Sequence, residues 1–363
     1  MLPKPKNDKT MTRTPSPRKR KRTVKVLLAV VALAVVGTAA GMWRAVFGPS
    51  LQAPEEGLAV YVPTGTTPQE LVELLRPHLR HTFLLETMTD YASRRRGEVH
   101  PGKFVLPQGL STYRTVKTFF TEHGVEVNVR FNATDRLEKI AGAVARQIEA
   151  DSVALMAVFR DPARLDSLGL DTLTVSSLFI PNTYRFYWNT SAEEFFERMC
   201  REYDRFWNAS RREKAEAIGM SPLEVTTLAS IVQAETAKVD ERPVVAGLYM
   251  NRLEKGIRLQ SDPTVIFAMR LAGRQDTIRR VYLSDLKIDS PYNTYKHKGL
   301  PPSPINIPDI SSIDAVLDYT RHNYIYMCAS VERFGYHEFA AGSAQHNRNR
   351  RAYIRWLNEK NIK

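Results

Sequence analysis

Apolar and polar positions alternate at helical or strand spacing along most of the chain, and one stretch interrupts this pattern. Residues 26–43, VLLAVVALAVVGTAAGMW, contain no charged side chain. At ~1.5 Å per residue the run is roughly 27 Å long, close to the ~30 Å hydrocarbon core of a bilayer. We therefore predict one membrane-spanning helix over residues 23–43, preceded by a basic cytoplasmic tail over residues 1–22.

The charge of the tail indicates how this helix is oriented. The formal net charge is +13, and the first 22 residues hold nine Lys or Arg side chains against one Asp. Basic residues stay on the cytoplasmic side, so the chain after Arg44 is expected outside the cytoplasm, at the cytoplasmic membrane. A cleaved signal peptide and a nucleic-acid-binding tail are the alternatives. The apolar run is longer than a usual signal core, and the tail lacks interleaved aromatic residues, so we expect an anchor and no nucleic-acid partner.

Three segments after a linker at residues 44–57 share a strand, turn and helix pattern. The second and third predicted strands cover residues 104–106 and 125–131. The predicted helix caps are Thr66 or Thr67, Ser111, and Thr134 or Asp135. Each segment is too small to bury its own apolar face, so we expect the three to pack together as a small α/β module.

From Ala150 onward the pattern is mostly helical, with Ser191 and Ser221 as predicted caps. Residues 176–188, SSLFIPNTYRFYW, fit either a core strand and turn or an aromatic surface that faces a substrate. Residues 290–308, SPYNTYKHKGLPPSPINIP, form a long loop whose aromatic content argues for an ordered structure. The fold class that we predict is α+β.

One carboxylate falls on the apolar stripe of a predicted helix. In ASIVQAETAKV, residues 229–239, Glu235 follows Leu228, Ile231 and Val232 by one or two helical turns. Burial disfavours the ionised form and can raise the pKa of a glutamate from ~4.3 toward ~6, which suits a proton donor. A glutamate at the edge of the stripe, with its carboxylate in water, fits the same periodicity. Periodicity alone does not decide between the two.

Four sequence blocks resemble the YceG-like family of endolytic murein transglycosylases in their order and spacing. The blocks are IVQAETA, MNRLEKGIRLQSDPTV, YNTYKHKGLPP and HEFAAGSAQHNRNRRAY. The resemblance extends from about Leu58 to the C-terminus. It implies a single membrane anchor, a LysM-like module over residues 58–124, and a mixed α/β catalytic domain with a helical core over residues 125–363. It also implies peptidoglycan glycan strands as substrate and peptidoglycan synthases as partners.

The same resemblance implies a role for Glu235 as the acid/base residue. This residue would cleave the β-1,4 bond between N-acetylmuramic acid and N-acetylglucosamine, and the muramyl 6-hydroxyl would then close on the anomeric carbon to give a 1,6-anhydro end. Ordinary glycosidases use two carboxylates. Asp262 precedes a proline and is expected to cap a turn, and Asp240 and Glu241 are expected in the first turn of the next helix. We therefore expect Glu235 alone to transfer the proton, with no cofactor.

Aromatic, amide and hydroxyl side chains in the second and third blocks are suited to an amino-sugar polymer. The predicted substrate-binding residues are Gln260, Asp262, Thr264, Tyr292, Asn293, Thr294 and Tyr295. Closure of a structural loop explains the same residues equally well. His337 and His346 match family positions, where hydrogen-bonded scaffold, groove contacts and metal ligation are the alternatives. They lack clustered partners, and we predict no metal site.

Two departures from the family pattern concern the boundary of the module. Ser176 and Ser177 stand where a Glu-Gly pair is usual, and NATDR replaces the usual acidic-glycine turn. Whether the module binds glycan stays open, because it lacks an obvious exposed aromatic rim. Two rival functions also stay open: a noncatalytic wall-binding scaffold, and a muramidase that uses water.

Overall fold

The chain forms two compact units in a computed structural model that describes residues 17–274, 278 and 280–360. The first unit is Met1–Val125 and the second is Glu126–Lys363. The domain boundary predicted from sequence lies between residues 124 and 125. Most of the predicted cytoplasmic tail, residues 1–16, lies outside the described residues.

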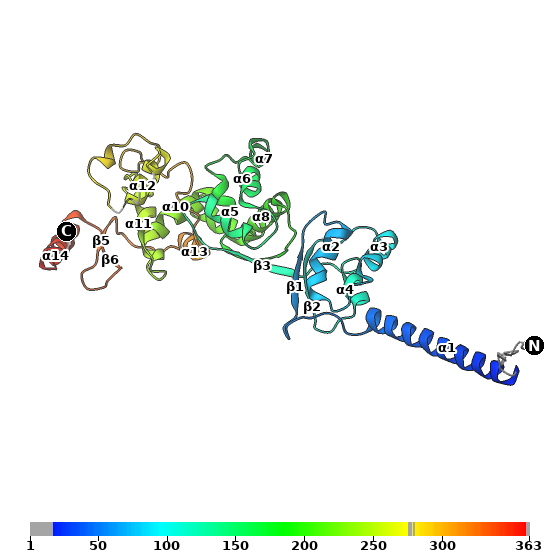
Figure 1. Cartoon of the computed structure of the whole chain (residues 1–363). Helices are drawn as coiled ribbons and strands as arrows, with labels where there is room; N and C mark the ends of the chain where they lie inside the picture. Colours follow the sequence, from blue (N-terminus) through cyan, green and yellow to red (C-terminus); the bar gives the residue numbers. More distant parts are fainter. Residues whose placement is uncertain (1–16, 275–277, 279, 361–363) are drawn as a thin grey trace, which may run out of the picture. The chain divides into compact units, whose positions relative to one another are not determined.

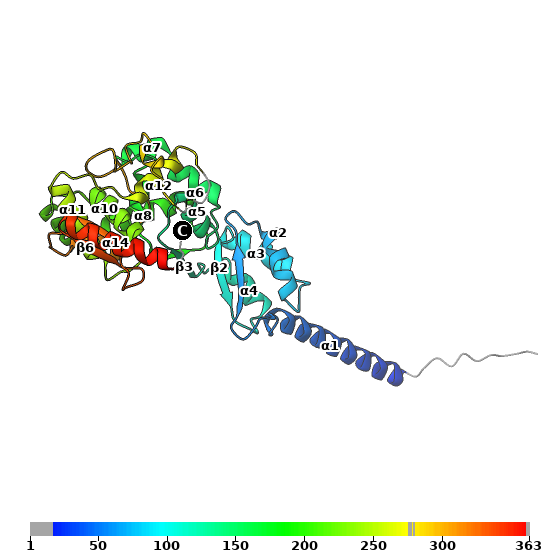
Figure 2. The same cartoon turned by 90° about the vertical axis from the view of Figure 1, so that its left-hand side faces the viewer.

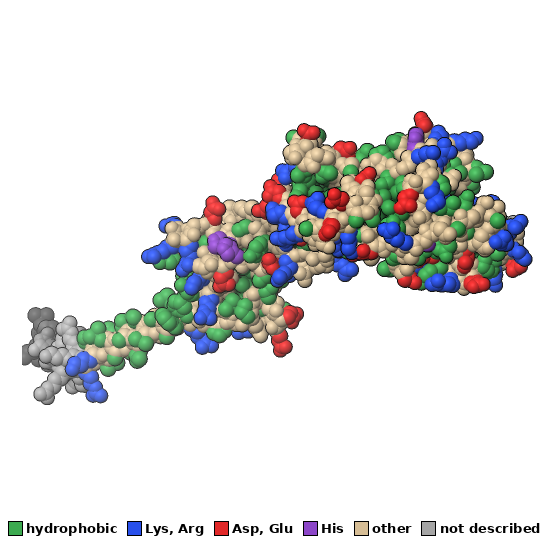
Figure 3. Space-filling model, turned by 180° about the vertical axis from the view of Figure 1, so that it is seen from behind, with side chains coloured by type: hydrophobic (Ala, Val, Ile, Leu, Met, Phe, Trp, Pro, Cys, Tyr) green, Lys and Arg blue, Asp and Glu red, His purple; other side chains and the backbone are tan. Residues whose placement is uncertain are grey.

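The first unit begins with one long helix, α1 (Pro17–Phe47), which Figure 1 shows as a continuous ribbon. Its segment Val24–Phe47 is long and apolar enough to span a membrane, and none of its most apolar window is buried in the protein. Figure 3 shows apolar side chains along the helix and basic ones near its start. The last turn contacts α4 (Thr112–Thr118), where the rings of Phe47 and Tyr113 lie 5.4 Å apart.

A two-stranded antiparallel sheet organises the rest of the first unit. Strand β1 (Leu58–Val62) pairs with β2 (Gly102–Leu106), with Val60 opposite Phe104. Alternate strand residues are buried against helices, as expected for a sheet covered on one face. These helices are α2 (Pro68–Leu75), the short η1 (Arg76–His78), α3 (Leu85–Arg96) and α4. The predicted caps at Thr67 and Ser111 are confirmed.

The third strand–helix segment belongs to the second unit, so the prediction that it packs with the first two is wrong. Strand β3 (Glu126–Phe131) pairs antiparallel with β4 (Asn182–Tyr187), about 55 residues later. Val129 and Phe131 share a core with Tyr184 and Phe186 of that partner strand. The apolar face of β3 is buried by β4 and by the helices of the second unit.

Helices surround this second sheet, and the first is capped differently from our prediction. They are α5 (Leu137–Ala145), α6 (Ser152–Phe159), α7 (Pro162–Ser167), η2 (Val175–Leu178) and α8 (Ala192–Phe206). The N-cap of α5 is Arg136, which makes no side-chain cap, whereas Thr134 forms an isolated bridge with Ile307. The predicted cap at Ser191 is confirmed. Phe179 and Tyr184 are buried, so residues 176–188 form a core strand and turn.

A second core in the same unit is helical and centres on α10 (Pro222–Glu235). The helix starts as predicted, because Ser221 and Glu224 form a reciprocal capping box and Pro222 takes the first position. Its neighbours include α9 (Ala209–Ala217), α11 (Arg242–Glu254), α12 (Asp262–Leu271) and α13 (Ile310–Leu317). The short η3 (Asp285–Lys287) lies against α12. The helix is buried on every side from Val225 to Val232, which fixes the position of its C-terminal end.

The chain ends in a hairpin and a helix that lie beside α11. Strands β5 (Tyr326–Ala329) and β6 (His337–Ala340) pair antiparallel and contact α14 (Ser343–Glu359). Figures 1 and 2 both show this group on the α11 side of the unit. The buried Arg252 of α11 joins the segments, since its guanidinium donates to the carbonyl oxygens of Ile325 at 2.7 Å and Leu259 at 2.6 Å.

Candidate active site

Glu235 is the last residue of α10, and its side chain is partly buried. Leu228, Ile231 and Val232, one and two turns earlier, are fully buried, as the apolar stripe predicted. Loss of hydration raises the pKa of Glu235 above its usual value, although hydrogen bonds from Ser261 and Tyr249 oppose that rise. The C-terminal end of a helix carries partial negative charge, which also disfavours a carboxylate there. The site therefore favours the protonated form of this carboxyl group more than water does.

Two hydroxyl groups donate to the same oxygen of this carboxyl group. Tyr249 Oη lies 2.7 Å from Glu235 Oε1, and Ser261 Oγ lies 2.5 Å from it. Tyr249 comes from α11 and is 1% exposed, whereas Ser261 directly precedes α12. Three separate helices thus meet at one carboxyl group.

The backbone around Ser261 is held by hydrogen bonds on both sides. Its amide donates to Thr294 Oγ1 at 3.0 Å, and its carbonyl accepts from Thr264 Oγ1 at 2.7 Å. The preceding Gln260 has φ 53°, the left-handed conformation that side chains with a Cβ rarely adopt. Among the described residues it is the one non-glycine residue with a positive φ. Such strain persists where the surrounding structure enforces it, often at functional sites.

Three of the predicted substrate-binding residues present side chains toward solvent near Glu235. Gln260 and Asp262 are exposed, and Tyr295 is partly buried. Tyr295 Oη donates to Asp262 Oδ1 at 2.6 Å, which joins the loop at residues 290–308 to the start of α12. The cap role expected for Asp262 is wrong: it is the first residue of α12, and Ser261 takes the N-cap position.

The other four predicted substrate-binding residues are buried and bonded within the protein. The hydroxyl groups of Thr264 and Thr294 are hydrogen-bonded, with their oxygens 2.8 Å apart. The Tyr292 hydroxyl is hydrogen-bonded to Ser303 Oγ at 2.6 Å. Asn293 is fully buried and donates to the carbonyl oxygens of residues 286 and 288. These contacts fit the alternative of structural loop closure, because side chains without exposed surface shape the loop and do not face a polymer.

The two candidate histidines differ in their surroundings. His337 Nδ1 lies 3.0 Å from Glu241 Oε2, and the His337 amide donates to Glu241 Oε1 at 2.6 Å. Glu241 is 5% exposed, so this contact ties β6 to the start of α11 and fits the scaffold alternative for His337. The ring of His346 stacks on Tyr326 with centroids 5.0 Å apart. Across the described residues, no group of three or more metal-ligating side chains gathers.

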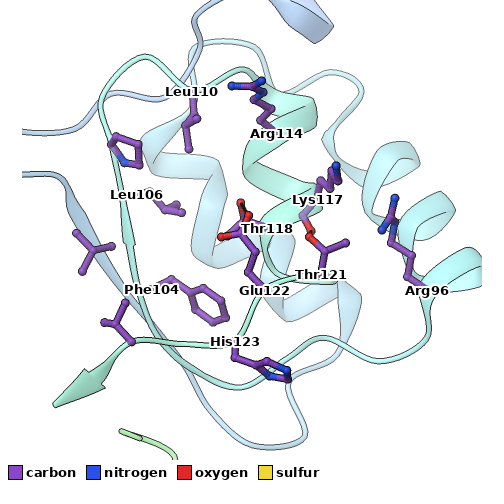
Figure 4. Close-up of a pocket in the computed structure, with 13 residues that line it drawn as sticks. Arg96, Phe104, Leu106, Leu110, Arg114, Lys117, Thr118, Thr121, Glu122 and His123 are labelled. Atoms are coloured by element: carbon purple, nitrogen blue, oxygen red, sulfur yellow. Dashed lines mark hydrogen bonds between the residues drawn. The ribbon is translucent and has the colours of Figure 1, made fainter.

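Glu235 lines neither of two hollows found in the described part of the chain. In the second unit, a cavity of about 570 Å³ is bordered by α5, α12 and residues 304–307. In the first unit, a groove of about 660 Å³ lies between β2 and α4. Figure 4 shows the side chains of Arg96, Arg114 and Lys117 at this groove, with Phe104 and Leu106 from β2. Glu122 is the one carboxylate among its lining residues, and it is exposed, in contrast to Glu235.

Sequence reasoning missed both direct partners of Glu235. Ser261 lies in the block MNRLEKGIRLQSDPTV, between the predicted substrate-binding residues Gln260 and Asp262, but a serine before Asp-Pro is typical of a helix cap. Tyr249 lies in a helix whose apolar spacing makes it an ordinary core residue. Neither signal points to Glu235, because both contacts depend on how α10, α11 and α12 meet in space.

Comparison with known proteins places this site in a family. The model of the YceG-like family matches residues 60–352. A curated protein of Bacillus subtilis named endolytic murein transglycosylase is 27% identical over 340 residues, which cover 86% of this chain and 91% of that protein. One of the same name from Streptococcus pneumoniae is 28% identical over 214 residues, 58% of this chain and 38% of that longer protein.

A solved structure extends the likeness to the fold. The crystal structure of a yceG-like protein from Listeria monocytogenes is similar with a TM-score of 0.50 and 26% sequence identity. The match covers 81% of this chain and 99% of that one. The mixed helix and strand architecture predicted from sequence is therefore shared with that protein.

Proposed function

The chain belongs to the YceG-like family, and on that premise we propose that it cuts peptidoglycan glycan strands with Glu235 as general acid and base. The class of enzyme predicted from sequence, a peptidoglycan lytic transglycosylase, is confirmed by curated relatives named endolytic murein transglycosylase. The observation that carries the assignment of Glu235 is a single partly buried carboxyl group, raised in pKa, held by two hydroxyl donors beside exposed polar residues.

The reaction that we propose moves one proton out of Glu235 and returns one to it. Protonated Glu235 gives its proton to the glycosidic oxygen as the bond from that oxygen to the muramyl anomeric carbon breaks. The leaving N-acetylglucosamine keeps the proton as its 4-hydroxyl. The muramyl 6-hydroxyl then bonds to the anomeric carbon, and its proton passes to the Glu235 carboxylate. The product is a 1,6-anhydro end, and no water is consumed.

One carboxyl group suffices for this sequence because the substrate supplies its own nucleophile. Retaining and inverting glycosidases need a second carboxylate to attack the sugar or to activate water. Here the internal 6-hydroxyl takes that place, and the substrate N-acetyl group can assist. Asp262 is the nearby acid on α12, and its hydrogen bond from Tyr295 supports a role in shaping the site.

We place the reaction outside the cytoplasm at the cytoplasmic membrane. The apolar segment Val24–Phe47 supports a single-pass anchor, and the basic residues before it support a cytoplasmic N-terminus. Gln260, Asp262 and Tyr295 are the residues that we propose to contact the glycan, since they are the accessible members of the predicted set. Peptidoglycan synthases as partners stay a prediction.

Substitution of Glu235 by Gln tests this function. The amide keeps the shape of the side chain and can accept from Tyr249 and Ser261 through its oxygen, but it has no proton to transfer. The full-length variant, assayed on purified peptidoglycan, is expected to lose about 10²–10⁴-fold in the release of soluble fragments. Unchanged release by a folded variant would refute the role of Glu235. Binding to sacculi without any cleavage by the unmodified protein would favour a noncatalytic scaffold.

A further inference from the structure

The two oxygens of the Glu235 carboxyl group are not equivalent. Both hydroxyl donors, Tyr249 Oη and Ser261 Oγ, reach Oε1. Within the part of the chain that the structure describes, no hydrogen bond to Oε2 is present. An oxygen that accepts two hydrogen bonds has used both of its lone pairs, whereas the other oxygen is free to carry a hydrogen.

We propose that Tyr249 and Ser261 are positioning residues that keep the transferable proton of Glu235 on Oε2. This inference rests on the proposed role of Glu235 as the acid. With Oε1 occupied by two donors, the acidic hydrogen sits on Oε2, the oxygen that no protein group engages. The proton that cleaves the glycosidic bond is therefore presented from one defined oxygen, and the same oxygen is free to take a proton back from the 6-hydroxyl.

The local structure at Ser261 is arranged for this contact at the expense of its own helix. Ser261 is the N-cap residue of α12, and serine at that position normally accepts a hydrogen bond from the first turn. Here its side chain makes no cap and donates to Glu235 instead. Thr294 and Thr264 form hydrogen bonds with the Ser261 backbone, and the preceding residue, Gln260, has a strained positive φ.

Tyr249 supplies the second donor from the opposite helix. Its hydroxyl lies inside the helical core, and burial together with the adjacent carboxyl group raises the pKa of Tyr249 well above its usual value. The hydroxyl therefore keeps its hydrogen at every pH at which the enzyme would work. A phenylalanine would fill the same space without the donor, which makes the contact separable from packing.

Other polar groups around the carboxyl group act through charge or through their own partners. They are Arg252 of α11, Asp262 of α12, Tyr295 of the 290–308 loop and His337 of β6. Asp262 raises the pKa of Glu235 and His337 lowers it. Neither Asp262 nor His337 forms a hydrogen bond with Oε1 or Oε2. The hydrogen bonds from Tyr249 and Ser261 therefore determine which oxygen carries the proton.

Substitution of Tyr249 by Phe separates this role from a structural one. Loss of a donor to the carboxylate raises the pKa of Glu235, so the alkaline limb of kcat/KM is expected to move up by about one pH unit. The maximal kcat is expected to fall about tenfold with KM little changed, because the proton is no longer confined to Oε2. Ser261→Ala is expected to change both quantities in the same directions.

The measurement is the pH dependence of cleavage of uncross-linked peptidoglycan strands by the full-length protein. Tyr184→Phe is the matched control, because Tyr184 is buried in the core around β3 and β4, away from Glu235, and its hydroxyl donates to the carbonyl of Ile180. This control is expected to leave the alkaline limb in place. Thermal unfolding of each variant reports whether it is folded, and Ser261→Ala provides the same test if Tyr249→Phe does not fold.

Each outcome decides for or against the positioning role. An unmoved alkaline limb in both Tyr249→Phe and Ser261→Ala, with or without a loss of rate, would overturn it. If Glu235→Gln is inactive in the same assay, that result leaves the proposed function standing. If Glu235→Gln retains activity, the proposed function itself fails, and the two failures are thus distinguished.

Discussion

Tyr295 donates a hydrogen bond to Asp262 at 2.6 Å, so the loop at residues 290–308 is joined to the start of α12 beside Glu235. The Asp262 carboxylate is thereby engaged by the protein, and its negative charge contributes to the raised pKa of Glu235. Asp262 therefore shapes the site and raises the pKa of Glu235, and this arrangement differs from that of a second catalytic carboxylate.

Substitution of Asp262 by Asn is expected to cost less than about tenfold in kcat/KM, well below the loss expected for a general acid. Removal of the negative charge lowers the pKa of Glu235, so the alkaline limb should move to lower pH. Tyr295→Phe keeps the charge and should leave the limb in place. A loss as large as that of Glu235→Gln would instead make Asp262 a catalytic residue.

The difference in stability between Glu235→Gln and the unmodified protein is expected to depend on pH. Burial raises the pKa of Glu235 above its usual value of 4.5, so the folded state favours the protonated form. The stability contributed by that form is fully present below pH 4.5 and is lost as the pH rises through the folded-state pKa. The variant should therefore melt higher than the unmodified protein at pH 8 and equally at pH 4. Equal melting temperatures at both pH values would contradict a raised pKa.

Asn293 is expected to stabilise the fold and not to contact the substrate. Its side chain donates to the carbonyls of Leu286 and Ile288 and accepts from the amide of Tyr295. Asn293→Ala leaves these groups without a partner and should cost about 2–3 kcal/mol of unfolding free energy. The exposed Asn128 of β3 is the control, and Asn128→Ala should change stability by less than about 0.5 kcal/mol. Normal stability with a raised KM would support substrate contact by Asn293.

Gly247 permits a close approach between α11 and the segment after α13. A Cβ at this position would lie 2.2 Å from the carbonyl oxygen of Thr320 and 2.9 Å from a ring nitrogen of His322. Gly247→Ala should therefore destabilise the protein by about 3 kcal/mol, although alanine normally favours a helix. A Cβ at Gly142 in α5 would meet only the side chain of Arg146, at 3.8 Å, which is ordinary van der Waals contact, so Gly142→Ala should be stabilising. Denaturant unfolding of both variants checks this, and equal effects would contradict the contact.

Local signals in the sequence were sufficient for the elements whose ends depend on neighbouring residues. Ser221 and Glu224 are three residues apart, and the capping box that they form needs nothing beyond the helix itself. The apolar run at residues 26–43 likewise specifies a helix by composition alone. The burial of Leu228 and Ile231, and with it the position of Glu235, followed from the 3.6-residue period.

Contacts between distant segments were the part that the pattern could not supply. The partner of β3 lies about 55 residues away, and alternation in β3 fits any partner strand equally. Tyr249 and Ser261 meet Glu235 only because three helices converge. Residues 292–294 were selected for their chemistry, yet their burial depends on the folding of the loop over α12, which composition does not reveal.

The origin of the oxygen at the new chain ends separates ring closure by the muramyl 6-hydroxyl from hydrolysis by water. The full-length protein would be incubated with purified peptidoglycan in ¹⁸O-labelled water, and the products analysed by mass spectrometry. Because the muramyl 6-hydroxyl closes the ring, we expect anhydro ends lighter by one water, without ¹⁸O, and none from Glu235→Gln. New reducing ends that carry ¹⁸O would show hydrolysis and contradict the mechanism.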